Sequence, residues 1–273
     1  MIEQDFLISI ISKFQKMENK DNQLKAFERL LHIMDDLRAQ CPWDKKQTFE
    51  SLRHLTIEET YELGDAILDQ NLTEIKKELG DLLLHIVFYA KIGSETNSFD
   101  IGAVCHEICD KLIFRHPHIY GNTKVSNEDD VKQNWEKLKL KEGKKSVLEG
   151  VPKSLPALVK ASRIQDKAKS IGFDWENSQQ VWEKVEEEIQ ELKIEIEHQN
   201  HNKIEEEFGD VLFSLINYAR FLKINPEDAL EKTNKKFIKR FQYIEQKAIE
   251  SQKSIADLSL NEMEMYWNEA KNI

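Results

Sequence analysis

The sequence predicts an all-α protein in which one helical-bundle domain occurs twice. Three observations predict this fold class: few turn-forming residues, apolar positions at helical spacing, and a carboxylate pattern that recurs in both halves. The 273 residues include only 9 Gly and 5 Pro, whereas 33% are charged. Abundant Glu, Lys and Leu favour helices, because strand-rich domains need more turn residues. Since one domain commonly has about 100–200 residues, the length allows two.

Composition and charge exclude several classes of protein. There are 50 acidic and 39 basic residues, which give a formal net charge of −11. That balance argues against a general nucleic-acid binder, which must neutralise phosphates with Lys and Arg. No apolar run is long enough to span a membrane, and the start of the chain does not resemble a signal peptide. Three cysteines, an odd number, fit a reducing compartment, so we expect a cytoplasmic protein. From the charge balance and the lack of a long apolar run, we expect no nucleic-acid and no membrane partner.

The helices are predicted in order along the chain from the spacing of apolar residues. A short amphipathic helix is expected within residues 1–20, and helices follow over 57–67, 75–92, 181–196 and 204–222. The helix over 75–92 carries a broad apolar stripe and should be a core helix. The members of this stripe are Leu79, Leu82, Leu83, Ile86, Val87 and Ala90. Breakers lie at Cys41-Pro42, Arg115-His116-Pro117, Gly121-Asn122 and Gly143–Pro156. The predicted organisation is an extension over 1–20, a domain over 21–145, a linker over 146–157 and a domain over 158–273.

The two halves repeat without a gap across the most acidic segments. Glu58-Glu59-Thr60-Tyr61-Glu62, followed by Glu78-Leu79-Gly80-Asp81, matches Glu187-Glu188-Ile189-Gln190-Glu191, followed by Glu207-Phe208-Gly209-Asp210. The offset is 129 positions throughout (188 − 59 and 210 − 81). Lys111–Arg115 matches Lys236–Arg240, and Trp135 matches Trp267, with small shifts. The chain therefore contains an N-terminal and a C-terminal copy of one helical unit.

The repeated carboxylates predict a metal site in each copy. Residues three or four apart share a helix face, so Glu59 lies beside Glu62, and Glu78 lies beside Asp81. Two such helices packed antiparallel would gather four carboxylates, which is unfavourable unless a cation lies between them. Oxygen donors without cysteine suit Mg²⁺, with Mn²⁺ as an alternative.

A glycine in the middle of each second acidic helix also needs an explanation. Gly80 and Gly209 lie inside predicted helices, where Gly costs about 1 kcal/mol relative to Ala. A close approach of a neighbouring helix, or contact with a ligand, would explain that cost.

These motifs together resemble the MazG family of nucleoside triphosphate pyrophosphohydrolases, within the all-α NTP pyrophosphatase superfamily. The resemblance extends from about residue 21 to the end and includes Cys41-Pro42-Trp43-Asp44, Arg115-His116-Pro117-His118, Gly172-Phe173-Asp174-Trp175 and both carboxylate blocks. It implies helical bundles that dimerise, which we expect to be intertwined in a homodimer. It also implies Mg²⁺-dependent cleavage of NTPs and dNTPs between the α and β phosphates, giving NMP and pyrophosphate.

The resemblance assigns roles to residues of each copy. In the C-terminal copy it implies metal ligands at Glu188, Glu191, Glu207 and Asp210, with Glu187 and Glu188 catalytic. The implied nucleotide contacts there are Lys184, Lys203, Glu206, Lys236, Arg240 and Trp267. In the N-terminal copy the matching ligands are Glu59, Glu62, Glu78 and Asp81, and the secondary site adds Glu58, Lys111, Arg115 and Trp135.

The two copies are not equivalent. At the offset of 129, Leu55 takes the place of Lys184, and Glu74 takes the place of Lys203. The N-terminal copy therefore lacks two cations at these positions, and we expect the C-terminal copy to perform most of the hydrolysis.

Two other readings are open at this stage. A di-iron carboxylate protein would need Glu-x-x-His on two helices, but only Glu195 and His198 form that motif. A non-catalytic scaffold that presents acidic faces to a partner would need no metal at all.

Overall fold

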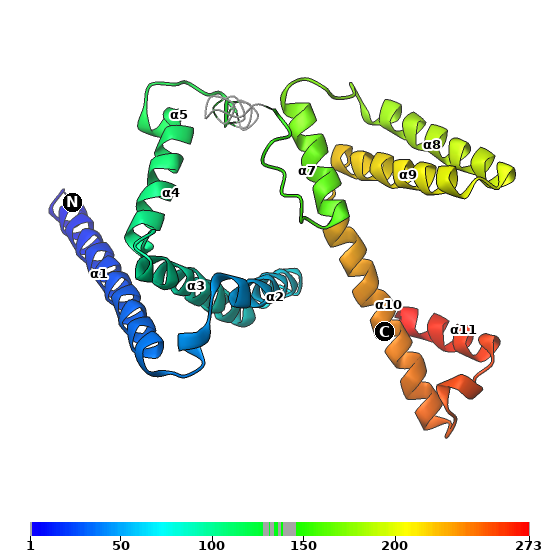
Figure 1. Cartoon of the computed structure of the whole chain (residues 1–273), viewed down its shortest axis with the longest axis horizontal. Coiled ribbons are helices and arrows are strands. Elements are labelled where there is room, and N and C mark those ends of the chain that lie inside the picture. Colours follow the sequence, from blue (N-terminus) through cyan, green and yellow to red (C-terminus); the bar gives the residue numbers. More distant parts are fainter. Residues whose placement is uncertain (1, 128–130, 132–133, 136–137, 139–145, 273) are drawn as a thin grey trace. The chain divides into compact units, whose positions relative to one another are not determined.

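The computed structural model describes residues 2–127, 131, 134–135, 138 and 146–272, and for residues 2–18 the backbone alone. All regular elements of these residues are helices, as the composition predicts (Figure 1). The chain divides into two compact units, Met1–Tyr120 and Gly121–Ile273. Each unit contains one carboxylate repeat, whereas the finer boundaries at 20, 145 and 157 stay predictions. Residues 143–145 of the predicted breaker Gly143–Pro156 lie outside the described residues.

The first unit is built around a hairpin of α2 and α3, and α1 and α4 pack against α3. Its helices are α1 (Ile2–Gln40), η1 (Asp44–Lys46), α2 (Phe49–Leu68), α3 (Leu72–Glu95), α4 (Ile101–Arg115) and α5 (Pro117–Tyr120). Because α1 is continuous from residue 2 to residue 40, the predicted extension is not a separate short helix: residues 2–20 begin a long one.

The second unit repeats the hairpin as α8 and α9, which lie side by side in Figure 1. α7 packs against α9 and α10, and α11 packs beside α10. The helices are α7 (Ala157–Ser170), α8 (Ser178–His198), α9 (His201–Phe221), α10 (Pro226–Glu250), η2 (Ile255–Asp257), α11 (Leu260–Glu269) and η3 (Ala270–Asn272).

The turns of the two hairpins are the same in conformation. Gln70 and Gln199 adopt the left-handed backbone conformation with φ of 54° and 56°. The next residue in each turn, Asn71 or Asn200, caps the following helix by accepting hydrogen bonds from backbone N–H groups of its first turn. Such a cap satisfies donors that have no partner within the helix. Since these positions are 129 apart, the sequence repeat is also a repeat of local structure.

The predicted core stripe of α3 is only partly buried. Val87 and Ala90 are 2% exposed and belong to the core of the first unit. Leu79, Leu83 and Ile86 are 52%, 39% and 48% exposed. The prediction that the whole stripe is core therefore does not hold within the single chain, because the first half of the stripe is left uncovered by the helices of the described residues.

Candidate metal centres

The hairpin of the N-terminal copy brings three of its predicted carboxylates together. Oxygen atoms of Glu59 on α2 and of Glu78 and Asp81 on α3 all lie within 4.8 Å of one another. Glu78 is 3% exposed, and no hydrogen-bond donor of the described residues reaches its Oε2 atom. A buried carboxylate oxygen without a donor is costly unless a cation approaches it.

The C-terminal copy forms the same cluster from the repeated positions. Oxygen atoms of Glu188 on α8 and of Glu207 and Asp210 on α9 lie within 4.8 Å of one another. Glu188 is 7% exposed, so each group contains one buried glutamate. The clusters differ in one respect, because the buried glutamate belongs to α3 in the first copy and to α8 in the second.

Partial burial and nearby like charges raise the pKa of one glutamate in each cluster. Partial burial raises the pKa of Glu59, and the nearby charges of Asp81, Glu62 and Glu78 raise it further. The pKa of Glu207 is raised by the same two causes, partial burial first and then the charges of neighbouring carboxylates such as Glu191. A cation placed among these carboxylates would favour their charged forms.

Four of the predicted acidic residues stay outside these tight groups. Glu62 and Glu191 lie one turn along the first helix of each hairpin and are exposed, although their charges act on the clusters. Glu58 and Glu187 are also exposed, and no ion pair of the described residues joins them to the second helix.

Two of the predicted nucleotide-binding lysines lie close to the C-terminal cluster. Lys184 Nζ is 2.7 Å from Glu188 and 2.9 Å from Glu187, and these hydrogen bonds raise the pKa of the lysine. Lys203 lies one helical turn before Glu207, and its Nζ atom is 2.6 Å from Glu206. Both ammonium groups therefore stay charged beside the carboxylates, where a phosphate group could replace one of their partners.

The other predicted nucleotide contacts form a group on α10 and α11. The Arg240 guanidinium lies over the Trp267 ring at 5.4 Å from its centroid, and Phe237 packs on the same ring at 5.1 Å. Lys236 is exposed. Within the described residues, no hydrogen bond or ion pair joins Arg240 to the carboxylates, so the structure does not gather these residues with the cluster.

The secondary residues of the N-terminal copy are likewise spread out. Lys111 and Arg115 lie on the last turns of α4, and Trp135 is 39% exposed outside that helix. His116 ends α4, and its ring Nδ1–H donates a 2.7 Å hydrogen bond to the Leu112 carbonyl. The Arg115-His116-Pro117 segment is a turn between α4 and α5, as the breaker predicts.

The glycines of the acidic helices have no packed neighbour. A Cβ atom built on Gly80 or Gly209 would meet no atom within 4 Å. The expected close approach of a helix is therefore wrong for the described residues, and contact with a ligand stays a prediction.

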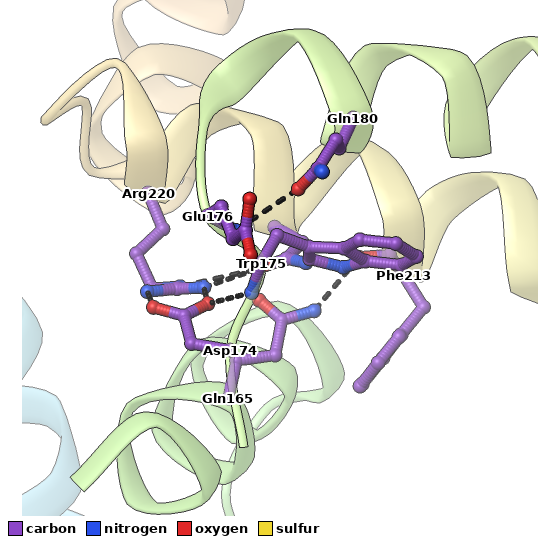
Figure 2. A network of polar contacts seen from close by, with 8 residues as sticks. Gln165, Asp174, Trp175, Glu176, Gln180, Phe213 and Arg220 are labelled. Carbon is purple, nitrogen blue, oxygen red and sulfur yellow. Dashed lines mark hydrogen bonds and ion pairs between the residues drawn. The ribbon is translucent and has the colours of Figure 1, made fainter. Parts of the chain in front are cut away.

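A polar network holds the start of the C-terminal hairpin in place (Figure 2). Arg220, at the end of α9, makes a two-pronged ion pair with Asp174 in the loop before α8. Asp174 also accepts a hydrogen bond from the Trp175 backbone N–H at 3.0 Å. Gln165 on α7 donates to the Phe213 carbonyl at 2.8 Å, three residues after Asp210. The network ties α7, the loop and α9 together, and this fixes the helix that carries Glu207 and Asp210.

One charged residue close to the N-terminal cluster was not predicted from the sequence. Lys77 Nζ on α3 lies 2.9 Å from Glu78 Oε1. Its counterpart 129 positions on is Glu206, so the comparison of copies that revealed the missing cations could not reveal this one.

The fold and the two clusters define a duplicated, all-helical protein with paired carboxylate sites suited to a divalent cation. A sequence profile of the MazG nucleotide pyrophosphohydrolase domain matches residues 47–120 and 176–244, the two hairpin regions. The chain belongs to this family.

Two relatives of similar length carry names that agree with the profile, and a third relative is longer and carries no such name. A Thermotoga maritima protein, named nucleoside triphosphate pyrophosphohydrolase/pyrophosphatase MazG, is 44% identical over 250 residues, which cover 90% of this chain and 95% of that protein. The Escherichia coli (strain K12) nucleoside triphosphate pyrophosphohydrolase is 40% identical over 257 residues, covering 91% and 98%. A Bacillus subtilis protein named uncharacterized protein YabN is 46% identical over 251 residues, covering 90% of this chain and 51% of its own length.

Every helix in the described part of the chain is too short or too polar to cross a lipid bilayer.

Proposed function

We propose that this protein is a Mg²⁺-dependent nucleoside triphosphate pyrophosphohydrolase. It cleaves NTPs and dNTPs between the α and β phosphates and releases NMP and pyrophosphate. The observation that carries the proposal is the pair of matched carboxylate clusters in a chain whose family relatives bear that name.

The chemistry of the donor atoms fits Mg²⁺, with Mn²⁺ as the alternative. Carboxylate oxygens alone favour a hard divalent cation, and Glu78 Oε2 is a buried acceptor without a donor among the described residues. The proposed ligands are Glu188, Glu191, Glu207 and Asp210 in the C-terminal copy, and Glu59, Glu62, Glu78 and Asp81 in the N-terminal copy. When bound, the cation would neutralise phosphate oxygens and make a nearby water more acidic.

The remaining chemistry falls to side chains of this chain. Glu187 is exposed beside Glu188 and is the proposed acceptor of the proton from the attacking water. Lys184 and Lys203 would bind phosphate oxygens and stabilise the charge that develops on pyrophosphate. The proposed contacts to the rest of the nucleotide are Glu206, Lys236, Arg240 and Trp267, and Trp267 would stack on a base of any identity.

We assign most of the hydrolysis to the C-terminal copy. Its Lys184 lies within 2.9 Å of both Glu187 and Glu188, whereas the first copy has Leu55 at the position of Lys184. The secondary site of the N-terminal copy comprises Glu58, Lys111, Arg115 and Trp135.

Product analysis tests this assignment directly. The protein is incubated with each NTP and dNTP plus Mg²⁺, and the products are separated. We expect NMP and pyrophosphate, and we expect Glu188→Gln to lower the turnover rate at least about 100-fold, because it removes a ligand of the reacting centre. The matched variant is Glu59→Gln at the repeated position, for which a smaller loss is expected. Release of NDP and orthophosphate would reject the cleavage position, and full activity of Glu188→Gln with loss in Glu59→Gln would reject the assignment of copies.

Self-association is the second part of the proposal. The two copies leave the same stripe uncovered: Leu79 and Phe208 are 52% and 55% exposed, and Leu83 and Leu212 are 39% and 46% exposed. These pairs are 129 apart. An uncovered apolar face that recurs in both copies supports a homodimer in which hairpins pack on hairpins of the partner.

A further inference from the structure

Each carboxylate cluster contains one lysine in direct contact with its buried glutamate, but the two lysines come from opposite helices. In the C-terminal copy, Lys184 on the first helix of the hairpin lies 2.7 Å from Glu188. In the N-terminal copy, Lys77 on the second helix lies 2.9 Å from Glu78. Each lysine therefore contacts a buried glutamate of its own helix.

The two lysines are not at equivalent positions of the repeat. Leu55 occupies the place of Lys184 in the first copy, and Glu206 occupies the place of Lys77 in the second. The pair Glu74 and Lys77 is thus the charge-reversed form of Lys203 and Glu206. A comparison of aligned positions shows only that the N-terminal copy lacks the cations Lys184 and Lys203. The structure shows that Lys77, at another position, places a cation beside the N-terminal cluster.

Burial explains why Glu78 holds this lysine. The Glu78 side chain is 4% exposed, and its Oε1 atom accepts the hydrogen bond from Lys77 while Oε2 has no donor in the described part of the chain. A buried carboxylate needs a positive charge nearby, and the ammonium provides it on one side. Oxygen atoms of Glu78, Glu59 and Asp81 lie within 4.8 Å of one another, so a second positive charge among them would be stabilised.

We propose that Lys77 is the resident cation of the N-terminal site: it neutralises Glu78 in the absence of metal and binds nucleotide phosphate when a divalent cation occupies the cluster. This inference rests on the proposed function. Lys77 is 61% exposed, so its ammonium can turn from Glu78 to an external anion without crossing packed side chains. The N-terminal copy is then a metal-dependent phosphate site in its own right, although its cation comes from a different position.

The proposal predicts opposite effects on two ligands. Lys77 and a divalent cation are both attracted to Glu78, and their charges repel each other, so removal of Lys77 should strengthen metal binding. The same removal should weaken nucleotide binding, because one charge-assisted contact to phosphate is lost. A residue that only stabilises α3 would not change the two affinities in opposite directions.

The experiment isolates the N-terminal site in the full-length chain. Glu188→Gln and Asp210→Asn disable the C-terminal cluster, and Lys77→Met is added to this background. Free Mn²⁺ is measured by electron paramagnetic resonance, and binding of an α,β-methylene analogue of ATP is measured by calorimetry with saturating Mn²⁺. We expect the Mn²⁺ affinity to rise about threefold to tenfold, and the analogue affinity to fall about tenfold.

Lys76→Met is the matched control. Lys76 is the exposed neighbour on the same helix, without a hydrogen bond or ion pair among the described residues, and its loss changes the net charge equally. We expect it to leave both affinities within about twofold of the background. Circular dichroism verifies that all variants keep their helical content.

Three results would overturn the proposal: no Mn²⁺ bound by the background protein, no opposite shift in Lys77→Met, or equal shifts in Lys76→Met. The product analysis of the wild-type protein separates this inference from the proposed function. If pyrophosphate is released while Lys77→Met behaves like the background, the role of Lys77 is rejected and the activity stands. If no pyrophosphate is released, the activity is rejected, and the Mn²⁺ measurement still decides the metal-competing role of Lys77.

Discussion

Asp174 shows how one residue of a conspicuous motif serves the structure of the hairpin. Its burial acts to raise its pKa, but the hydrogen bonds and the charge of Arg220 outweigh burial, so the pKa of Asp174 lies below its ordinary value of 3.8. The folded state therefore binds this proton more weakly than the unfolded state. The resulting stabilisation is present above about pH 4 and is lost as the pH falls through the lowered pKa.

The ion pair gives a prediction at the scale of one residue. We expect Asp174→Asn to lower the free energy of unfolding at pH 7 by about 1 to 2 kcal/mol, because both side chains are only partly accessible to water. The difference from the wild type should shrink when unfolding by urea is repeated near pH 3. Glu176→Gln, two residues on and without a side-chain ion pair in the described residues, should change stability little at either pH. Equal stability of Asp174→Asn and wild type at pH 7 would contradict the role given to Arg220.

The sequence could not reveal this pair. Asp174 and Arg220 are 46 positions apart, and neither belongs to a periodic pattern that marks them as neighbours. Spacing along one helix predicts which residues share a face, but a contact between a loop and the end of another helix depends on how the helices pack. Lys77 is missed for another reason: its counterpart in the second copy is Glu206, so the repeat does not mark position 77 as a cation near the site.

At the scale of an element, the left-handed residue in a hairpin turn lowers the free energy of unfolding by an amount that can be measured. Gln199 has a φ of 56°, which places its backbone in the left-handed region that residues other than glycine rarely adopt. We expect Gln199→Gly to raise the free energy of unfolding by about 0.5 to 1 kcal/mol, because Gly adopts this conformation without steric conflict. Gln190→Gly, in the middle of α8, should lower it by about 1 kcal/mol. Thermal or urea unfolding measures both, and a loss of stability in both variants would contradict the argument.

Helical periodicity predicted the elements that carry the clusters well. The expected helices 57–67, 75–92 and 181–196 lie within α2, α3 and α8, and the expected helix 204–222 ends one residue beyond α9. Spacing of three residues placed Glu78 beside Asp81 and Glu207 beside Asp210, as the structure has them. Spacing did not separate Glu62 and Glu191 from the tight groups, because residues on one helix face still differ in their distance from the neighbouring helix.

At the scale of the whole molecule, the uncovered stripes of α3 and α9 predict association. Leu83 and Leu212 occupy the same position of the two hairpins and are partly exposed in the single chain. We expect Leu83→Arg or Leu212→Arg, or both together, to convert a dimer into monomers in sedimentation equilibrium, because a charge in an apolar interface is left without a partner. Asn202→Arg, exposed on α9, adds the same charge outside the stripe and should leave the mass unchanged.

A concentration series provides an independent check of the same idea. If hairpins of two chains cover each other's stripes, the midpoint of thermal unfolding should rise with protein concentration. An unchanged midpoint, together with a monomeric mass of the wild type, would contradict the homodimer.

The closeness of the cluster residues along the chain has a consequence for synthesis. Glu59 and Asp81 belong to one hairpin, and Glu188 and Asp210 belong to another, so each site is formed by a single contiguous segment. Contacts of such short sequence separation form early and quickly during folding. The N-terminal cluster is therefore complete in sequence once α3 has left the ribosome, well before the second hairpin is translated. Metal captured at that moment would stabilise the first hairpin while the rest of the protein is still being made.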